Sequence, residues 1–186
     1  MEILKKVLEF VMDILETVTF VGSLFIVVYL FILQPNEVRG QSMDVTFRDG
    51  EYILTSKLSY KFGEPIRGDV VVFKSPEDEE VDFIKRIIGV PGDTVMIQSG
   101  DVYVNGEKLP EDYAQHPSNP IEGGYLVDGQ EISVPEGQLF VMGDNRPRSS
   151  DSRAFGPIPI QSIIGKVFFR YFPAPRLGTI KNPYTQ

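Results

Sequence analysis

One lysine in the sequence stands where a charged side chain is costly. Residues 82–93 read DFIKRIIGVPGD, and alternate side chains of an extended strand point to opposite faces. Val81, Phe83, Lys85 and Ile87 then share one face, and no acidic residue accompanies the lysine in that row. A buried ammonium without a partner tends to lose its proton, and a neutral lysine is a competent general base. The stretch therefore predicts a base at Lys85.

A general base needs a nucleophile to activate, and Ser42 is the candidate. It lies in VRGQSMDVTF, between Gly40 and Met43, a few residues after a long apolar segment. A loop serine preceded by a glycine can expose its hydroxyl and its own backbone N–H together, and such an N–H can stabilise an oxyanion. The residues alone leave two readings open, a nucleophile and an ordinary turn serine.

A third unusual stretch is MGDNRPRSSDSRAFG, residues 142–156, which gathers aspartates, arginines and serines in one loop. It could be a solvated turn held by Asp–Arg pairs, or a rigid platform that positions the lysine. The sequence of this stretch does not distinguish between these two interpretations.

These groups must be positioned by a domain that follows an N-terminal anchor. Residues 17–33, TVTFVGSLFIVVYLFIL, carry no charge and reach the short end of a membrane span, and Pro35 is expected to end the helix. Residues 1–16 have apolar side chains at helical spacing opposite charged ones, which indicates an amphipathic extension at the interface. Acidic residues before the apolar run, and the lack of a small-x-small site in FILQPNEV, argue against a cleaved leader. A buried core helix is the remaining alternative.

The rest of the chain is predicted to be mainly β. Short β-branched runs separated by Gly-Asp pairs indicate many turns, and Asn105-Gly106 indicates a type I′ hairpin. The predicted division is an anchor at 1–35 and a catalytic domain at 36–186, with a loop-rich excursion around 105–135. Strands are expected at 51–56, 69–74, 81–90, 94–98, 101–104, 131–134, 138–142 and 164–172.

Composition excludes several kinds of site. The net charge of −8, without basic runs interleaved with aromatics, makes nucleic acid an unsuitable partner. There is no cysteine, and the one histidine, His116, lies in a turn-rich segment, so thiolate and multi-histidine metal sites are excluded. We expect neither a metal nor a cofactor, and we read His116 as a surface residue rather than as part of a catalytic triad.

Taken together, the motifs resemble those of type I signal peptidases. GQSM near the end of an N-terminal span, RGDVVVF, FIKRIIGVPGD and MGDNRPRSSDSRAFG occur in the family's order. The chain is similar to the short, single-span form. The resemblance implies a strand-rich, Greek-key-like catalytic domain on the extracytoplasmic side of the cell membrane, with its active site near the lipid. It implies secretory preproteins as substrates, cut after a small-x-small sequence. It says nothing about oligomeric state.

The resemblance also implies roles for particular residues. Ser42 would be the nucleophile and its backbone N–H the oxyanion donor, with Lys85 as general base. Ser149 would correspond to the serine that hydrogen-bonds the lysine amine. The supporting charged residues would be Asp151 paired with Arg153, and Asp144 and Arg146 buttressing the same loop.

Two positions depart from the family pattern. The third residue after the nucleophile is usually proline and is Val45 here, so the turn after Ser42 is expected to differ in shape or rigidity. Two residues before the nucleophile, some members carry a serine that assists the oxyanion, and this chain has Gly40.

Two other functions fit parts of the sequence. A self-cleaving Ser–Lys repressor shares related chemistry, but it needs a DNA-binding N-terminal domain where this chain has its apolar segment. A tethered β-domain acting as an adhesion or assembly module needs no catalysis at all. An assay for cleavage of a secretory precursor distinguishes a signal peptidase from these two alternatives.

Overall fold

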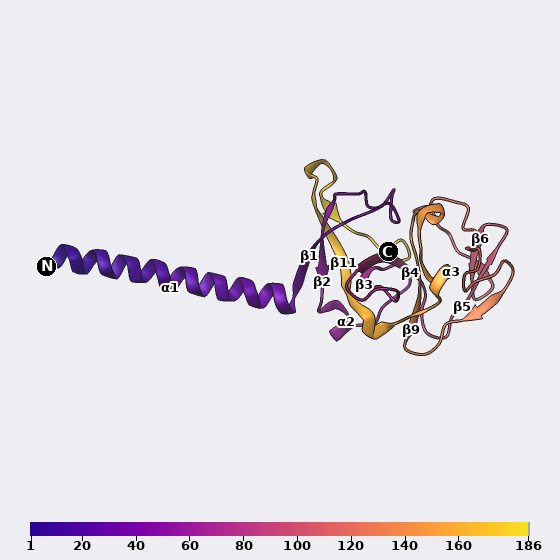
Figure 1. Cartoon of the computed structure of the whole chain (residues 1–186), viewed down its shortest axis with the longest axis horizontal. Coiled ribbons are helices and arrows are strands. Elements are labelled where there is room, and N and C mark those ends of the chain that lie inside the picture. Colours follow the sequence, from indigo (N-terminus) through magenta and orange to yellow (C-terminus); the bar gives the residue numbers. More distant parts are fainter. Residues whose placement is uncertain (186) are drawn as a thin grey trace.

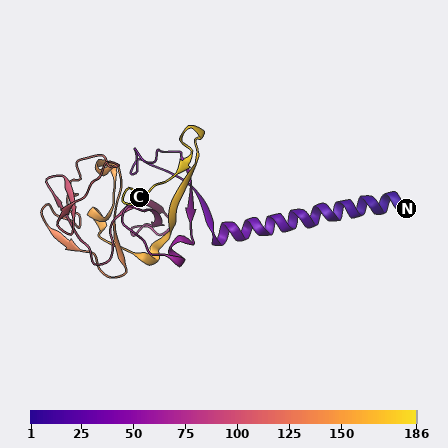
Figure 2. The same ribbon diagram turned by 180° about the vertical axis from the view of Figure 1, so that it is seen from behind.

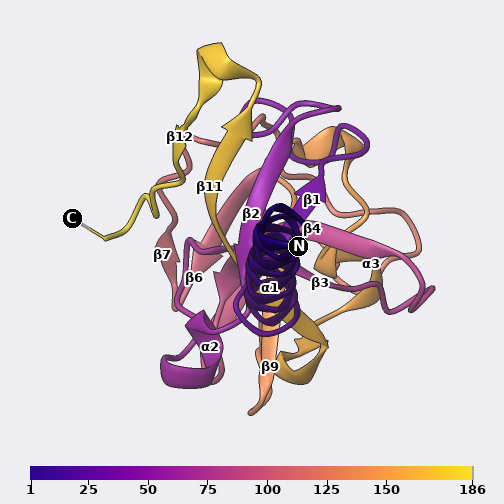
Figure 3. The same ribbon diagram turned by 90° about the vertical axis from the view of Figure 1, so that its left-hand side faces the viewer.

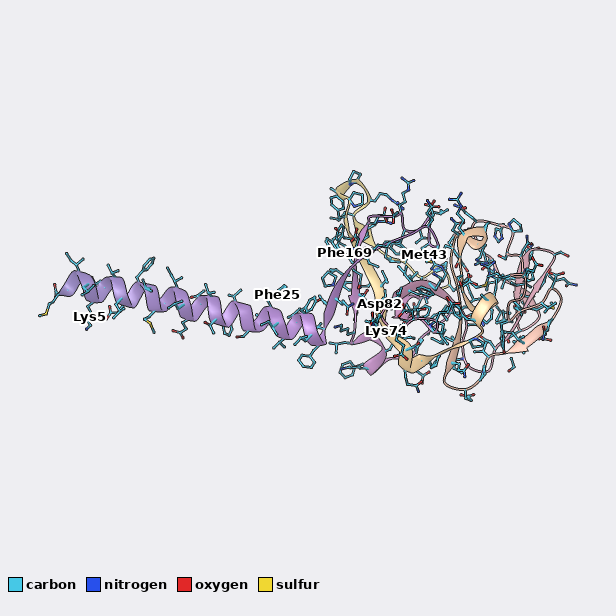
Figure 4. All side chains as sticks on the ribbon, viewed as in Figure 1. Lys5, Phe25, Met43, Lys74, Asp82 and Phe169 are labelled. Atoms are coloured by element: carbon cyan, nitrogen blue, oxygen red, sulfur yellow. The ribbon has the colours of Figure 1, made fainter. Side chains whose placement is uncertain are left out.

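The chain forms one long N-terminal helix and a strand-rich domain, and the computed structural model describes residues 1–185 (Figure 1). Helix α1, Glu2–Phe31, is 30 residues long and buries none of them. It projects away from the domain in opposite views (Figures 1 and 2), and its side chains, Lys5 and Phe25 among them, extend into the surroundings (Figure 4). It is the one helix in the described residues that is long and apolar enough to cross a membrane.

The helix ends earlier than its apolar segment suggested. Ile32 caps α1, and Leu33 already begins strand β1, Leu33–Glu37, which pairs antiparallel with β2, Tyr52–Ser56. The prediction that Pro35 ends the helix is wrong, because Pro35 lies within β1. A proline is tolerated there because β1 is the edge strand of its sheet. The expected boundary at residue 35 therefore falls inside the sheet.

The eight expected strands are all present, each with its ends within one residue of the prediction. The alternation of apolar and polar residues did not predict β1, β10 or β12, which are edge or two-residue strands. The remaining bounds are β3 Val70–Lys74, β4 Asp82–Gly89, β5 Thr94–Gln98, β6 Asp101–Val104, β7 Glu107–Lys108, β8 Glu131–Ser133, β9 Gln138–Met142, β10 Ile158–Pro159, β11 Ile163–Phe172 and β12 Gly178–Thr179. The short helices are α2 Ser59–Phe62, α3 Ser152–Phe155, η1 Arg146–Arg148, η2 Ile160–Ser162 and η3 Ala174–Arg176.

The strands form two antiparallel sheets. The larger one has the order β1-β2-β11-β3-β4-β9-β10, with β12 paired to β11, and the smaller has the order β7-β6-β5-β8. Strand β11 comes from late in the chain and lies between β2 and β3, which agrees with the predicted mainly β, Greek-key-like domain. In Figure 3, which looks along α1, the domain lies behind the helix.

The apolar core lies on both faces of the larger sheet. In β3, Val70 and Val72 join one buried cluster, and Val71 and Phe73 join another on the opposite face. This is why VVVF is continuously apolar instead of alternating. Strand β4 is an interior strand of this sheet, between β3 and β9, and its residues 85–89 are all buried. Lys85 is thus placed in the interior by the topology of the sheet.

The expected excursion begins with the Asn-Gly hairpin. Asn105 and Gly106 have positive φ values of 53° and 79°, as a type I′ turn requires, and they join β6 to β7. Residues 109–130 contain none of the helices and strands that the structure describes, yet Leu109 and Leu126 are buried in the core of the smaller sheet. The excursion is therefore packed onto the domain.

The exposed apolar surface of α1 leads to a first prediction. The full-length protein should remain in the membrane pellet through an alkaline carbonate wash, because about 45 Å of helix exceeds the roughly 30 Å hydrocarbon core. The control is a chain starting at Ile32, which keeps β1 complete and should be released. Release of the full-length protein would mean that α1 is not a membrane anchor.

Candidate active site

Lys85 is buried in the central strand β4, with 3% of its surface exposed. Its register partner is Val71, and its Nζ lies 5.0 Å from the centroid of the Phe83 ring. The amine donates a hydrogen bond to the Ile84 carbonyl oxygen at 3.0 Å. Burial lowers the pKa of Lys85 to about 8, although Asp151 and Asp144 oppose part of this effect. The amine is therefore largely neutral in mildly alkaline solution.

Ser42 lies in the loop between β1 and β2 and meets the lysine. Its Oγ is 2.8 Å from Lys85 Nζ, a hydrogen-bonding distance. The loop is fixed because Met43 and Phe47, which follow Ser42, are buried in the core. Asn145 adds two bonds: its backbone N–H donates to the Ser42 carbonyl at 3.0 Å, and its Nδ2 donates to the Gln41 carbonyl at 2.9 Å.

The backbone around Ser42 differs from the expected family pattern at two points. Gly40 has φ +92°, so a serine there would have space but a strained backbone. Val45 has φ +88°, which a proline cannot adopt and which is unusual for a β-branched residue. The Ser42 N–H makes no hydrogen bond within residues 1–185 and is free to donate to a ligand.

The loop that starts at Gly143 leaves β9 beside Lys85, because Met142 pairs with Arg86 on β4. A Cβ atom at Gly143 would lie 2.4 Å from the Ser42 carbonyl oxygen and 2.3 Å from Ser149 Oγ. Only glycine fits there without moving one of these groups. The Gly143 N–H donates to Asp151 Oδ2 at 3.0 Å, which fixes the start of the loop.

Asp151 and Arg153 form the expected pair, at 2.8 Å between Oδ1 and Nε, and both side chains are buried. Arg153 also donates through Nη2 to the carbonyl oxygens of Arg146 and Ser149. These bonds tie the two ends of the loop together. The stretch is thus a rigid, buried structure, and the reading of it as a solvated turn is wrong.

Asp144 and Arg146 bind outside their own loop. Asp144 accepts two hydrogen bonds from the Arg86 guanidinium of β4, at 2.9 and 2.7 Å. Arg146 forms a buried ion pair with Glu111 of the excursion, and its Nη1 lies 2.9 Å from Glu111 Oε2. The two residues therefore fasten the loop to β4 and to the excursion.

Ser149 is buried close to these groups, but the expected bond to the lysine is absent. Its Oγ has no hydrogen-bond partner within the described residues, and no bond joins it to Lys85 Nζ. Its exposed fraction is 7%. Its assignment as the partner of Lys85 therefore remains a prediction.

A groove of about 720 Å³ opens at Ser42 and Lys85. It runs from Pro35 in β1 to Arg148 and Ser150, and its apolar lining includes Ile53, Val72 and Ile84. Ser42 and Lys85 thus both line a surface depression that could hold an extended peptide.

Sequence reasoning missed three residues of this arrangement, namely Arg86, Glu111 and Asn145. Arg86 carried a signal, because a buried guanidinium requires a carboxylate, and Asp82, the acidic residue on its face of β4, lies at the exposed start of the strand and pairs with Lys74. Glu111 and Asn145 carried none, since their roles depend on the path of loops. His116 is exposed as expected, and residues 1–185 contain no group of three metal-ligating side chains.

Comparison with known proteins agrees with the motifs. The family described as signal peptidase, peptidase S26, matches residues 10–172. Signal peptidase IB of Staphylococcus aureus is 38% identical over 185 residues, covering 92% of this chain and 96% of that one. A probable signal peptidase I-1 of Synechocystis is 40% identical over 157 residues, covering 81% and 76%. The crystal structure of a signal peptidase I from Enterococcus faecalis is 35% identical, covers 56% of this chain and 97% of that one, and has a TM-score of 0.44.

The match runs from within α1 to the end of β11 and so includes both Ser42 and Lys85. It covers the apolar helix and the β-domain together as parts of one peptidase family, and it favours an enzyme over a non-catalytic module. The chain belongs to the signal peptidase family, peptidase S26, as a serine endopeptidase of the type I kind.

Proposed function

We propose that this signal peptidase cuts preproteins with Ser42 as nucleophile and neutral Lys85 as general base. The observation that carries the proposal is the 2.8 Å separation between Ser42 Oγ and the amine of Lys85, a residue that is 3% exposed. Burial that lowers the pKa of this amine to about 8 supplies a base at a usable pH. Removal of signal peptides by a serine protease is the activity of the family to which the chain belongs.

The chemistry follows from these two groups. Lys85 Nζ accepts the proton of Ser42 Oγ while this oxygen attacks the scissile carbonyl carbon. The negative charge that forms on the carbonyl oxygen is stabilised by the Ser42 N–H, which has no protein partner within residues 1–185. Protonated Lys85 then gives its proton to the departing amine as the C–N bond breaks. A water molecule, deprotonated by the same lysine, hydrolyses the acyl-enzyme and releases Ser42.

The loop from Gly143 to Arg153 positions the pair. Asp151 and Arg153 hold it closed, while Asp144 and Arg146 fasten it to β4 and the excursion. Ser149 orients the Lys85 amine once its hydroxyl rotates toward it, which would give this buried Oγ the partner that it lacks.

The substrate is the segment around the signal-peptide cleavage site of a preprotein. The groove has Val72 and Ile84 in its apolar lining, and in this proposal it receives the small side chains of a small-x-small sequence. In this proposal α1 is a single span and the β-domain is extracytoplasmic, where translocated preproteins emerge. Tyr52, Tyr171, Phe172 and Leu177 give the domain exposed apolar side chains for contact with lipid.

Ser42→Ala tests the proposal directly. The variant should fold and insert normally, because Ser42 lies at the surface of the groove, but its cleavage of a secretory precursor should fall by about 10³-fold or more. The measurement is the appearance of shortened product with detergent-solubilised protein. Near-normal turnover would exclude Ser42 as the nucleophile.

The Lys85→Arg variant distinguishes two roles of Lys85, a general base and a structural cation. Arginine keeps the charge but does not give up its proton in a protein, so the variant should be as inactive as Ser42→Ala. Circular dichroism checks that the fold survives. A folded Lys85→Arg enzyme with substantial activity would show that Lys85 serves only as a cation.

Ser149→Ala should lower kcat about ten- to a hundredfold with little change in KM, because it removes a hydrogen bond to the base and not to the substrate. Ser150→Ala is the matched control, since Ser150 is exposed and should tolerate the change. If Ser150→Ala is the damaging variant, the positioning role belongs to the neighbouring serine.

A further inference from the structure

A second hollow, of about 640 Å³, adjoins the groove that holds Ser42 and Lys85. The two depressions share Arg148 and Ser150, so they meet at this point of the 142–156 loop. The second hollow extends over the excursion at Asn119 and Pro120 and over α3. It is large enough for several side chains of an extended peptide, and the proposed mechanism does not use it.

The two depressions differ in charge. The groove is lined by Glu37, Glu80 and Asp82 as well as by Lys85 and two arginines. No carboxylate lines the second hollow, but three arginines do: Arg146, Arg148 and Arg153. An extended chain that crossed from one to the other would leave a partly acidic lining for one that exposes arginine and no carboxylate.

Arg148 is the arginine in the hollow that is free to bind a ligand. Arg146 and Arg153 are buried and paired with Glu111 and Asp151. Arg148 is exposed, forms no ion pair within residues 1–185, and contacts the neutral side-chain oxygen of Gln41. A guanidinium that binds a neutral amide can exchange it for a carboxylate at a gain in electrostatic energy.

The position of the anchor gives the direction of the substrate. The groove begins at Pro35 and Asn36 of β1, directly after α1, whereas the second hollow lies over α3 on the side of the domain away from α1 (Figure 1). A signal peptide held in the membrane reaches Ser42 from the anchor side. The residues after the scissile bond then continue toward the second hollow.

We propose that the second hollow binds the first residues of the mature protein and that Arg148 selects acidic side chains among them. This rests on the proposed function, since it assumes that the bond is cut at Ser42. A carboxylate two or three residues after the scissile bond would pair with the guanidinium, whereas a lysine there would be repelled. Arg148 is thus a specificity-determining residue.

The test uses the full-length protein in detergent and three precursor peptides that differ only in the second residue after the scissile bond: glutamate, glutamine or lysine. For wild type, kcat/KM should be about three- to fivefold higher with glutamate than with lysine, the range expected for an exposed ion pair. The difference should lie mainly in KM and should shrink with added salt. In Arg148→Ala the ratio should fall to about one, and in Arg148→Glu it should invert.

Arg39→Glu is the matched control, because it makes the same charge change on an exposed arginine at the anchor end of the groove. It should leave the glutamate-to-lysine ratio unchanged. A ratio that does not respond to Arg148, or that responds equally to Arg39, would overturn the assignment. Failure of wild type to cut any of the three peptides, or cutting by Ser42→Ala, would instead contradict the proposed function.

Discussion

An amine buried without a carboxylate partner is the constraint on which the site depends. The sheet places Lys85 between β3 and β9, where a charged group is poorly solvated and its pKa falls to about 8. Two aspartates, Asp144 and Asp151, lie near enough to oppose this shift. Each is bound to its own arginine, Arg86 or Arg153, so its charge is already compensated. The charged loop thus supplies rigidity close to the lysine without holding it protonated.

The nucleophile is positioned by packing and by backbone contacts. Met43 anchors the segment after Ser42 in the core, Asn145 holds the two carbonyl oxygens of residues 41 and 42, and Gly143 lets the two loops approach closely. The turn continues through Val45, whose positive φ excludes the proline common in the family. The Arg176 side chain donates to the Val45 carbonyl at 3.1 Å, so η3, between β11 and β12, supports this turn. The loop thus holds Ser42 without the usual proline.

Much of the fold could be predicted because its signals are local. Alternation and turn residues located eight of the strands, and the type I′ hairpin followed from Asn105-Gly106. The apolar row around Lys85 correctly indicated a buried lysine. The rest depends on contacts between distant segments. The polar strand β1 is stabilised by pairing with β2. Glu111, which pairs with Arg146, and Asn145, which binds the Ser42 carbonyl oxygen, come from loops whose paths leave no periodic pattern.

The pH dependence of kcat/KM tests most directly whether buried Lys85 is the base. This parameter reports ionisations of the free enzyme, and a base must be unprotonated to act, so activity should rise with pH through the pKa of Lys85 and then level off. With the full-length protein and an uncharged substrate, the half-maximal value should lie near the pKa of about 8 that burial produces. A rise centred near 10.5, the value of a lysine in water, would contradict the account.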